Sequence, residues 1–271
     1  MNYENNFLWK NRVKYYSGEI NSTRLWRYMP FEQFMYILEQ KKLWFTRLSE
    51  FKDEYEGTFK LEHFYKYYVV KKVDNNDLPF MTNDYDEAKH ILLPEEIRQN
   101  VFKSIRHSLD NSFANCWTMK DTDSDVMWYA FGKGNNSIAI ITSYSSLIDT
   151  FAKCQELWNF EIRPIEYIDY KDFLINDNDG YIPLFRKRKR YIDENELRII
   201  VSRFDDKCMK HNEFVDEELN QKLPGLYISI DIHNLIERVA INPDADSWFK
   251  DLVECICKKN KLLCCSGDNI G

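Results

Sequence analysis

Acidic and basic side chains alternate along one segment in the second half of the chain. Glu194, Glu196 and Arg198 are spaced two residues apart, and a β-branched run follows at residues 199–201. Such runs favour strands, and residues two apart on a strand share a face. We therefore predict a strand over residues 191–201, with these three side chains on one side. The opposite side is aliphatic and faces a core: Leu197, Ile199 and Val201.

Carboxylates that enter a buried strand are costly to desolvate unless they are paired or used. A fixed carboxylate can accept a hydrogen bond from a ribose hydroxyl. It can also stabilise the positive charge that develops on a sugar as a glycosidic bond breaks. The alternative is that either glutamate pairs with Arg198 or with the basic run at residues 186–190 and only shapes the strand edge.

Arg27, within a predicted strand over residues 25–28, is the candidate partner of these carboxylates. A guanidinium binds a pyrophosphate as a two-pronged fork. Aromatic side chains near it could stack on a nicotinamide ring. The candidates for the cofactor site are Arg27, Tyr28, Phe45, Thr46 and Trp128. The alternative for the aromatic residues is ordinary core packing, because rings on strands are commonly buried.

Two charged segments could bind a divalent ion or a phosphate backbone. Asp53 and Glu56 lie in an acidic loop that could shape a pocket or hold a divalent ion, or could simply be a solvated turn before a helix. Residues 186–190 are five consecutive cations. They form either a solvated charge run or a patch that holds phosphate or faces RNA.

Other catalytic motifs and metal-binding patterns do not occur. The seven cysteines include no C-x-x-C pair, and the five histidines are scattered, so no metal site is expected. The sequence contains no G-x-S-x-G elbow. The glycines at 132 and 134 lack the spacing of a phosphate-binding loop and indicate a turn.

Composition and charge restrict the class of protein. The chain has 271 residues, 44% hydrophobic and 30% charged, which is typical of a globular protein. Its net charge of −7 would not attract nucleic acid without a local basic patch. The sequence shows neither an 18-residue apolar stretch nor a signal-peptide pattern, and its odd number of cysteines suggests reduced thiols. We expect a cytoplasmic protein that does not enter membranes; its oligomeric state is left open.

The hydrophobic periodicity predicts an α+β fold, a single domain over residues 1–271 with a mixed, mostly antiparallel sheet. Expected strands cover residues 25–28, 43–46, 113–118, 137–142, 161–169, 226–231 and 239–242. Expected helices cover residues 31–38, 126–131, 145–154 and 245–259. Residues 161–169 should form an edge strand, because Pro164 cannot donate to a ladder.

The remaining segments are expected to be helical or irregular. Residues 58–110 should form a helical insertion, with helices at 58–72 and 86–110 and a loop at 73–86. Residues 1–22 are expected to be a short helix or an arm. The tail after Leu263 is expected to be loose.

Four pieces in order carry a resemblance to a bacterial family. They are LWRYMPFEQF (25–34), LWFTRLSEFKDEYE (43–56), CWT (116–118) with MWYAF (127–131), and ENELR (194–198). Together they resemble the uncharacterised family called domain of unknown function 2971, over residues 23–257. Lys52 stands where the family prefers Asn, Tyr55 replaces Phe, and Phe131 lies near the family's Tyr. The resemblance implies a context of phage defence or toxin-like loci.

A more distant similarity is to the ADP-ribosyltransferase fold, and it implies the first hypothesis. Those enzymes have a basic residue on the first strand, a middle strand with Ser or Thr, and a late Glu-x-Glu strand; Arg27, Thr46 and Glu196 follow this order. The hypothesis is an NAD-dependent ADP-ribosyltransferase-like enzyme with a protein or nucleic-acid acceptor. The similarity implies that Glu196 is the catalytic carboxylate and that Glu194 orients the acceptor. Two alternatives remain: a nucleic-acid-acting effector (nuclease or RNA binder), and a non-enzymatic sensor or partner-binding protein.

Overall fold

The computed structural model describes residues 3–8, 11–18, 24–53, 55–57, 68–73, 76–81, 99, 103, 106–154, 159–169, 182–202 and 223–266. The chain groups into two compact units. The first contains residues 1–46, 113–164 and 193–271, and the second contains residues 47–112 and 165–192. The segment expected as an insertion thus groups with a later segment of the chain.

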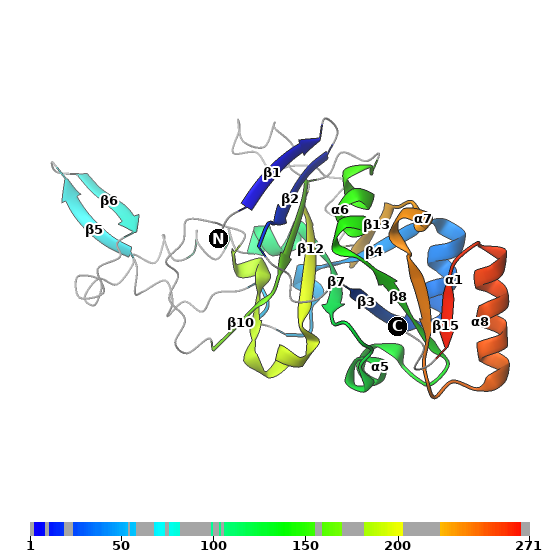
Figure 1. The fold of residues 1–271 in the computed structure, drawn as a ribbon. Helices are drawn as coiled ribbons and strands as arrows, with labels where there is room; N and C mark the ends of the chain where they lie inside the picture. The colour runs from blue at the N-terminus through cyan, green and yellow to red at the C-terminus, as the bar shows by residue number, and fades with distance from the viewer. Residues whose placement is uncertain are drawn as a thin grey trace. The chain divides into compact units, whose positions relative to one another are not determined.

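An eleven-stranded sheet forms the first unit and confirms the predicted α+β class (Figure 1). Its main path is β1 (Tyr3–Leu8), β2 (Asn11–Tyr16), β9 (Asn159–Pro164), β12 (Glu196–Ser202), β7 (Ser112–Met119), β3 (Leu25–Pro30), β8 (Ser137–Thr142), β14 (Arg238–Ile241) and β15 (Cys264–Ser266). The pairings are mostly antiparallel; β2 with β9 and β14 with β15 are parallel.

Strand β7 is the branch point of this sheet. Besides its neighbours β12 and β3, it also pairs with β4 (Lys42–Arg47), which in turn pairs with β13 (Gly225–Ser229). Its end pairs with β3 through Leu25 opposite Met119 and Trp26 opposite Thr118. The strands that carry Arg27, Thr46 and Glu196 therefore all border β7.

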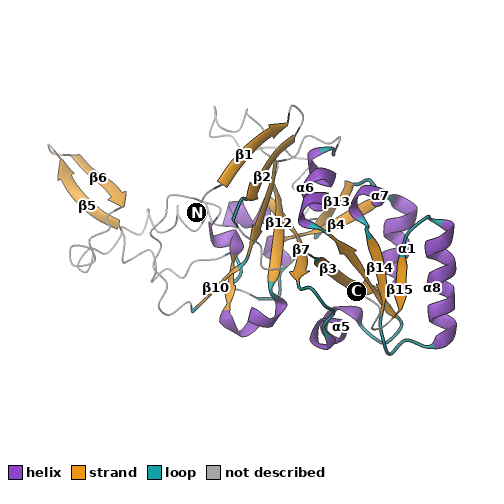
Figure 2. Ribbon diagram, viewed as in Figure 1, coloured by secondary structure: helices purple, strands orange, loops and turns teal. Residues whose placement is uncertain are grey.

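Strand alternation divides the apolar side chains between two cores. On β8, Ile138 and Ile140 belong to the main core, whereas Ala139 and Ile141 belong to a smaller one. Helices α1 (Phe31–Gln40), α6 (Tyr144–Ala152), α7 (Ile232–Leu235) and α8 (Ser247–Lys259) contribute to the main core, and α5 (Asp125–Gly132) contributes to the smaller core. Figure 2 shows these helices against the sheet.

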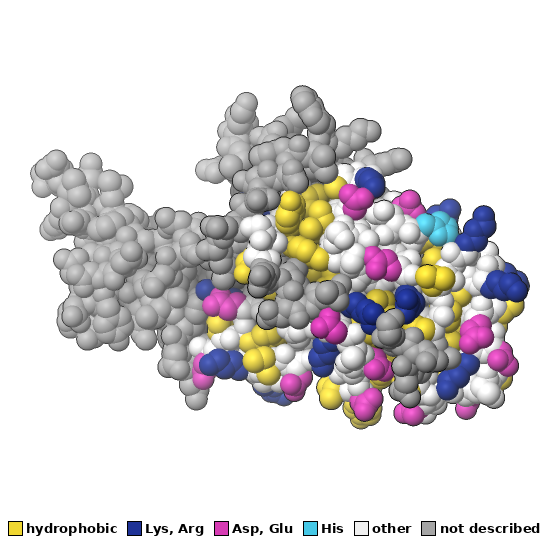
Figure 3. Space-filling view, viewed as in Figure 1, with side chains coloured by type: hydrophobic (Ala, Val, Ile, Leu, Met, Phe, Trp, Pro, Cys, Tyr) yellow, Lys and Arg dark blue, Asp and Glu magenta, His cyan; other side chains and the backbone are white. Residues whose placement is uncertain are grey.

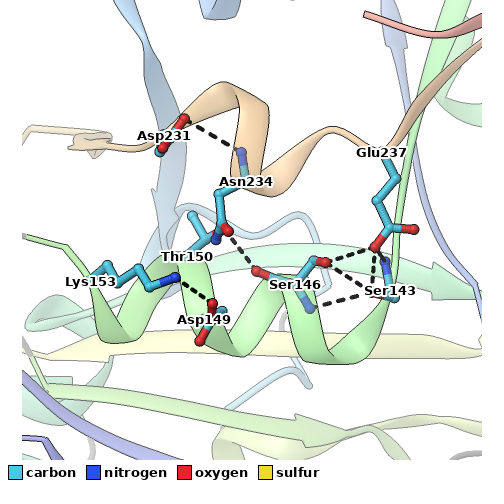
Figure 4. A network of polar contacts seen from close by, with 8 residues as sticks. All are labelled: Ser143, Ser146, Asp149, Thr150, Lys153, Asp231, Asn234 and Glu237. Atoms are coloured by element: carbon cyan, nitrogen blue, oxygen red, sulfur yellow. Dashed lines mark hydrogen bonds and ion pairs between the residues drawn. The ribbon is translucent and has the colours of Figure 1, made fainter.

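Polar contacts join the start of α6 to the segment after α7 (Figure 4). Ser143 is the N-cap of α6, which begins one residue before the predicted start of this helix. The carboxylate of Glu237 accepts hydrogen bonds from the Ser143 backbone N–H at 3.2 Å and from the Ser146 hydroxyl at 2.7 Å. Asn234 donates to the Thr150 hydroxyl at 2.9 Å. A carboxylate at a helix N-terminus satisfies donors that the helix itself leaves open.

The second unit combines short strands and 3-10 turns. Its elements are η1 (Leu48–Glu50), β5 (Tyr68–Val73), β6 (Asn76–Met81), β10 (Glu166–Ile168), η2 (Ile182–Phe185), β11 (Arg186–Arg188) and most of η3 (Lys189–Glu194). Strands β5 and β6 form an antiparallel hairpin, so the predictions of helix at residues 68–72 and of loop at 76–81 are wrong. Residues 106–110 are helical, as expected. The rest of the predicted helices over 58–110 falls largely outside the described residues.

Three further predictions for the first unit are wrong. Residues 3–8 and 11–16 form strands β1 and β2 rather than a helix or an arm. Strand β9 lies between β2 and β12 rather than at an edge, with Pro164 as its last residue. Residues 264–266 of the tail form β15. Strands β1 and β2 pair as a local hairpin, whereas β9 pairs with strands that are far away in the sequence, and such distant pairing leaves little local pattern.

Two surface properties accompany this fold. On the face seen in Figure 3, acidic and basic side chains are interspersed over the described residues. Within the described part of the chain, no helix has the length and apolar character needed to cross a bilayer.

Candidate functional site

The segment around Glu196 departs from the predicted strand. Residues 191–194 belong to the 3-10 turn η3, and β12 begins at Glu196. Between them Asn195 has a φ of 40°, in the left-handed region. Glu194 and Glu196 therefore do not alternate along one strand, and the prediction that their carboxylates share one strand face is wrong.

Asn195 holds this break against β7. The Met119 backbone N–H donates to the Asn195 carbonyl at 2.8 Å. The Asn195 side-chain amide donates back to the Met119 carbonyl. Asn tolerates the left-handed conformation better than most residues, so its position here ends the turn and sets the first residue of β12.

Glu196 and Arg198 form a two-pronged ion pair on one face of β12. The Arg198 Nε donates to Glu196 Oε1 at 2.6 Å, and Nη2 donates to Oε2 at 3.0 Å. Both residues are buried, with exposed fractions of 3% for Glu196 and 0% for Arg198. The aliphatic residues between and after them lie in the main core, as predicted. Of the alternatives that the sequence left open, the structure shows the one in which Glu196 pairs with Arg198.

Arg27 lies on β3, which borders β7 on the side opposite to β12. Its Nη1 donates to the Cys116 carbonyl of β7 at 2.7 Å. Burial lowers the pKa of Arg27, while the neighbouring charges of Cys116 and Glu196 raise it. The charge of Glu196 thus acts on Arg27 from the other side of β7.

A second Glu-x-Arg pair on β9, which the prediction missed, extends the charged row. Arg163 lies directly opposite Arg198 in the strand register, and it forms an ion pair with Glu161 two residues earlier on its own strand. Both β9 residues are buried. The signal was present in the sequence, because Glu161-Ile-Arg163 repeats the spacing of Glu196-Leu-Arg198. Strands β9 and β12 thus each carry a buried Glu–Arg pair.

The three aromatic residues proposed to stack on a ligand are buried instead. Exposed fractions are 7% for Tyr28, 0% for Phe45 and 5% for Trp128. Phe45 belongs to the main core, and the rings of Tyr28 and Trp128 meet edge-to-face at 4.8 Å in the smaller core. Their faces are covered by protein, so the alternative of core packing fits them better. Thr46 is half-buried, and its hydroxyl accepts from Trp44 Nε1 at 3.1 Å.

In the second unit, Asp53 and Glu56 pair with the basic run. Arg188 contacts Asp53 through Nε and Nη2, both at 2.9 Å, and Lys187 Nζ lies 3.2 Å from Glu56 Oε1. Arg186 pairs with Glu166 at 2.7 Å. Three of the five cations are thus committed to carboxylates, and the interpretation of residues 186–190 as a solvated run holds for Lys189 and Arg190, which are exposed.

These pairings bear on the nucleic-acid hypothesis. Cations that already neutralise carboxylates contribute less to binding a phosphate backbone. Carboxylates that accept from Lys or Arg are likewise less available to a divalent ion. Among the described residues, no group of three or more His, Cys, Asp or Glu side chains is arranged to hold a metal.

Comparison with known proteins returned no match. Neither a family model, nor a curated protein, nor a solved structure matches the chain. The resemblance to domain of unknown function 2971 and the similarity to ADP-ribosyltransferases therefore stay predictions.

Proposed function

We propose that this protein is an ADP-ribosyltransferase-like enzyme that uses NAD. The observation that carries the proposal is the neighbourhood of Arg27 and Glu196 on two strands that both border β7. The half-buried guanidinium of Arg27 and the buried carboxylate of Glu196 supply the two kinds of charge that a nucleotide pyrophosphate and a reacting ribose require.

Each residue has a separate task in this proposal. The Arg27 guanidinium binds phosphate oxygens as a fork. The Glu196 carboxylate stabilises positive charge as it develops on the ribose. Arg198 fixes the orientation of that carboxylate through its two hydrogen bonds. NAD supplies a glycosidic bond whose cleavage releases nicotinamide with the bonding electron pair, and the acceptor that bonds to the ribose carbon gives up a proton.

A second candidate function is supported by the same ion pair. Because Arg198 occupies both oxygens of Glu196, the pair also fits a purely structural role in a non-enzymatic, partner-binding protein. The two candidates differ in one outcome: only the enzyme loses its activity when the charge at position 196 is removed from an otherwise folded protein.

The test is incubation of the purified chain with labelled NAD and cell lysate. We expect labelling by the unmodified protein and a loss of about 100-fold or more in Glu196→Gln, the usual effect of removing one electrostatic stabiliser of a transition state. Equal labelling by both proteins, or none by either, contradicts the proposal.

Glu161→Gln is the matched control. Glu161, on the neighbouring strand β9, is similarly buried, at 4% exposed. It also pairs with the arginine two residues later on its own strand. Both variants leave a buried arginine without its carboxylate, so their losses of stability should be comparable. Labelling that survives in Glu161→Gln but not in Glu196→Gln separates catalysis from folding.

A further inference from the structure

Three aromatic side chains gather on the outer face of the β4–β13 pair. Tyr227 lies opposite Trp44 in the register, with ring centroids 4.7 Å apart. Tyr36 of α1 stacks on Tyr227 at 4.8 Å and 28°. Tyr36 and Tyr227 are 40% and 43% exposed. We call these three residues the aromatic platform.

The local sequence explains why the platform faces outward. On β4, Leu43 and Phe45 point into the main core, so alternation sends Trp44 to the other side. On β13, a Cβ at Gly225 would lie 2.3 Å from Trp44 Cζ2, so the glycine leaves room for the indole. Trp44 Nε1 is satisfied by Thr46, which leaves the ring faces as the main contact surface.

The size of the platform indicates the kind of ligand. Three rings are far smaller than the roughly 800 Å² per partner of a stable protein interface. Tyrosine and tryptophan faces stack on planar heteroaromatic rings such as nucleobases, worth about 1–3 kcal/mol per base. The platform therefore fits one small planar group.

Polar groups at both ends of the platform add a charge preference. Lys42 lies two residues before Trp44 on the same strand face, opposite Ser229, and Lys41 next to it is exposed. Within the described part of the chain, neither lysine forms an ion pair. At the other end, the Thr46 hydroxyl accepts from Trp44 and keeps its own proton to donate.

We propose that the aromatic platform binds a nucleotide, with the base stacked on the outer face of the Tyr36–Tyr227 stack and the phosphate held by Lys42. The proposal goes beyond the transfer reaction, because it concerns equilibrium binding and needs no chemistry. If NAD labelling fails while nucleotide binding depends on Tyr227, the proposed function is overturned and the platform stands. If NAD labelling succeeds while nucleotide binding does not depend on Tyr227, the platform proposal is overturned and the proposed function stands.

The test is calorimetric titration of the whole chain with AMP. We expect binding at about millimolar AMP or below, weakened about 5-fold or more in Tyr227→Leu because stacking is lost. Tyr36→Leu should weaken binding in the same direction. Trp248→Leu is the control, since Trp248 is a 58% exposed indole on α8, and it should leave the affinity unchanged.

A second arm separates the base from the phosphate. Lys42→Gln should weaken AMP about 5-fold but leave adenosine unchanged, because only AMP carries the anion that the lysine attracts. Ribose 5-phosphate should bind more weakly than AMP. No binding of AMP at about 10 mM, or equal AMP affinities in the unmodified protein and folded Tyr227→Leu, overturns the inference.

Discussion

Tyr28 shows at the residue scale how burial couples one side chain to solution pH. Its ring stacks on Trp26 at 5.8 Å and meets Trp128 edge-to-face. Burial raises the pKa of the phenol, and the carboxylates of Asp123 and Asp125 raise it further. The folded protein therefore holds this proton at pH values where the unfolded chain, with an ordinary tyrosine pKa of about 10, releases it.

This difference predicts an alkaline loss of stability. Since the folded pKa is raised, the contribution is complete below about pH 10 and is lost as the pH rises above it. Tyr28→Phe removes the titration, so the free energy of unfolding should fall less steeply, by up to about 1.4 kcal/mol per pH unit. Urea unfolding between about pH 8 and pH 11 measures it. Tyr129→Phe, at a 91% exposed position, is the control; identical slopes for Tyr28→Phe and the unmodified protein would refute the argument.

Asn195 shows, also at this scale, where residue spacing misleads. The alternation of residues 194, 196 and 198 is a regular strand pattern, yet a single residue with φ of 40° interrupts the extended backbone between the first two. Its conformation is sustained by bonds to Met119, 76 residues away. A local pattern contains no information on such a distant partner.

At the scale of elements, the strand pair β9–β12 concentrates the buried charge. Arg163 and Arg198 are direct cross-strand neighbours, an arrangement of like charges that is unfavourable in isolation. Each is offset by a glutamate on its own strand. The row is therefore stable as two complete pairs and sensitive to the loss of any one member.

A double-mutant cycle tests this dependence. Arg198→Met leaves the Glu196 carboxylate buried without its partner, so it should reduce the free energy of unfolding by about 3–5 kcal/mol. Combining it with Glu196→Gln should restore a large part of that loss, because no buried charge then remains in the pair. Urea denaturation gives the four stabilities. Additive losses would show that the pair is not coupled.

The elements also show what could be predicted. Strands β3, β4, β7, β8, β13 and β14 and helices α1, α5 and α8 follow local hydrophobic periodicity, and most of each lies where the sequence predicts. The hairpins β1–β2 and β5–β6 and the interior position of β9 were not predicted. Each depends on which strand pairs with which, and the hydrophobic pattern of one segment does not specify its partner. Aromatic residues were misassigned because alternate faces of the same strand are both buried, so ring content says little about exposure.

At the scale of the whole molecule, the net charge of −7 does not attract an anionic ligand such as NAD. Binding of NAD therefore depends on local cations, which is the role proposed for Arg27. A low-dielectric surrounding strengthens such a local interaction.

The central claim is that Arg27 and Glu196 together form an NAD site, and nicotinamide release tests it most directly. Release from NAD by the purified whole chain is followed by chromatography, with Arg27→Lys as the variant and Arg24→Lys as the control. Arg24 is a nearby arginine whose guanidinium donates to the Asp121 carbonyl at 3.3 Å. We predict release by the unmodified protein and by Arg24→Lys, and a loss of about 100-fold in Arg27→Lys, which lacks the planar fork. No release by the unmodified protein, or equal release by Arg27→Lys, would contradict the account.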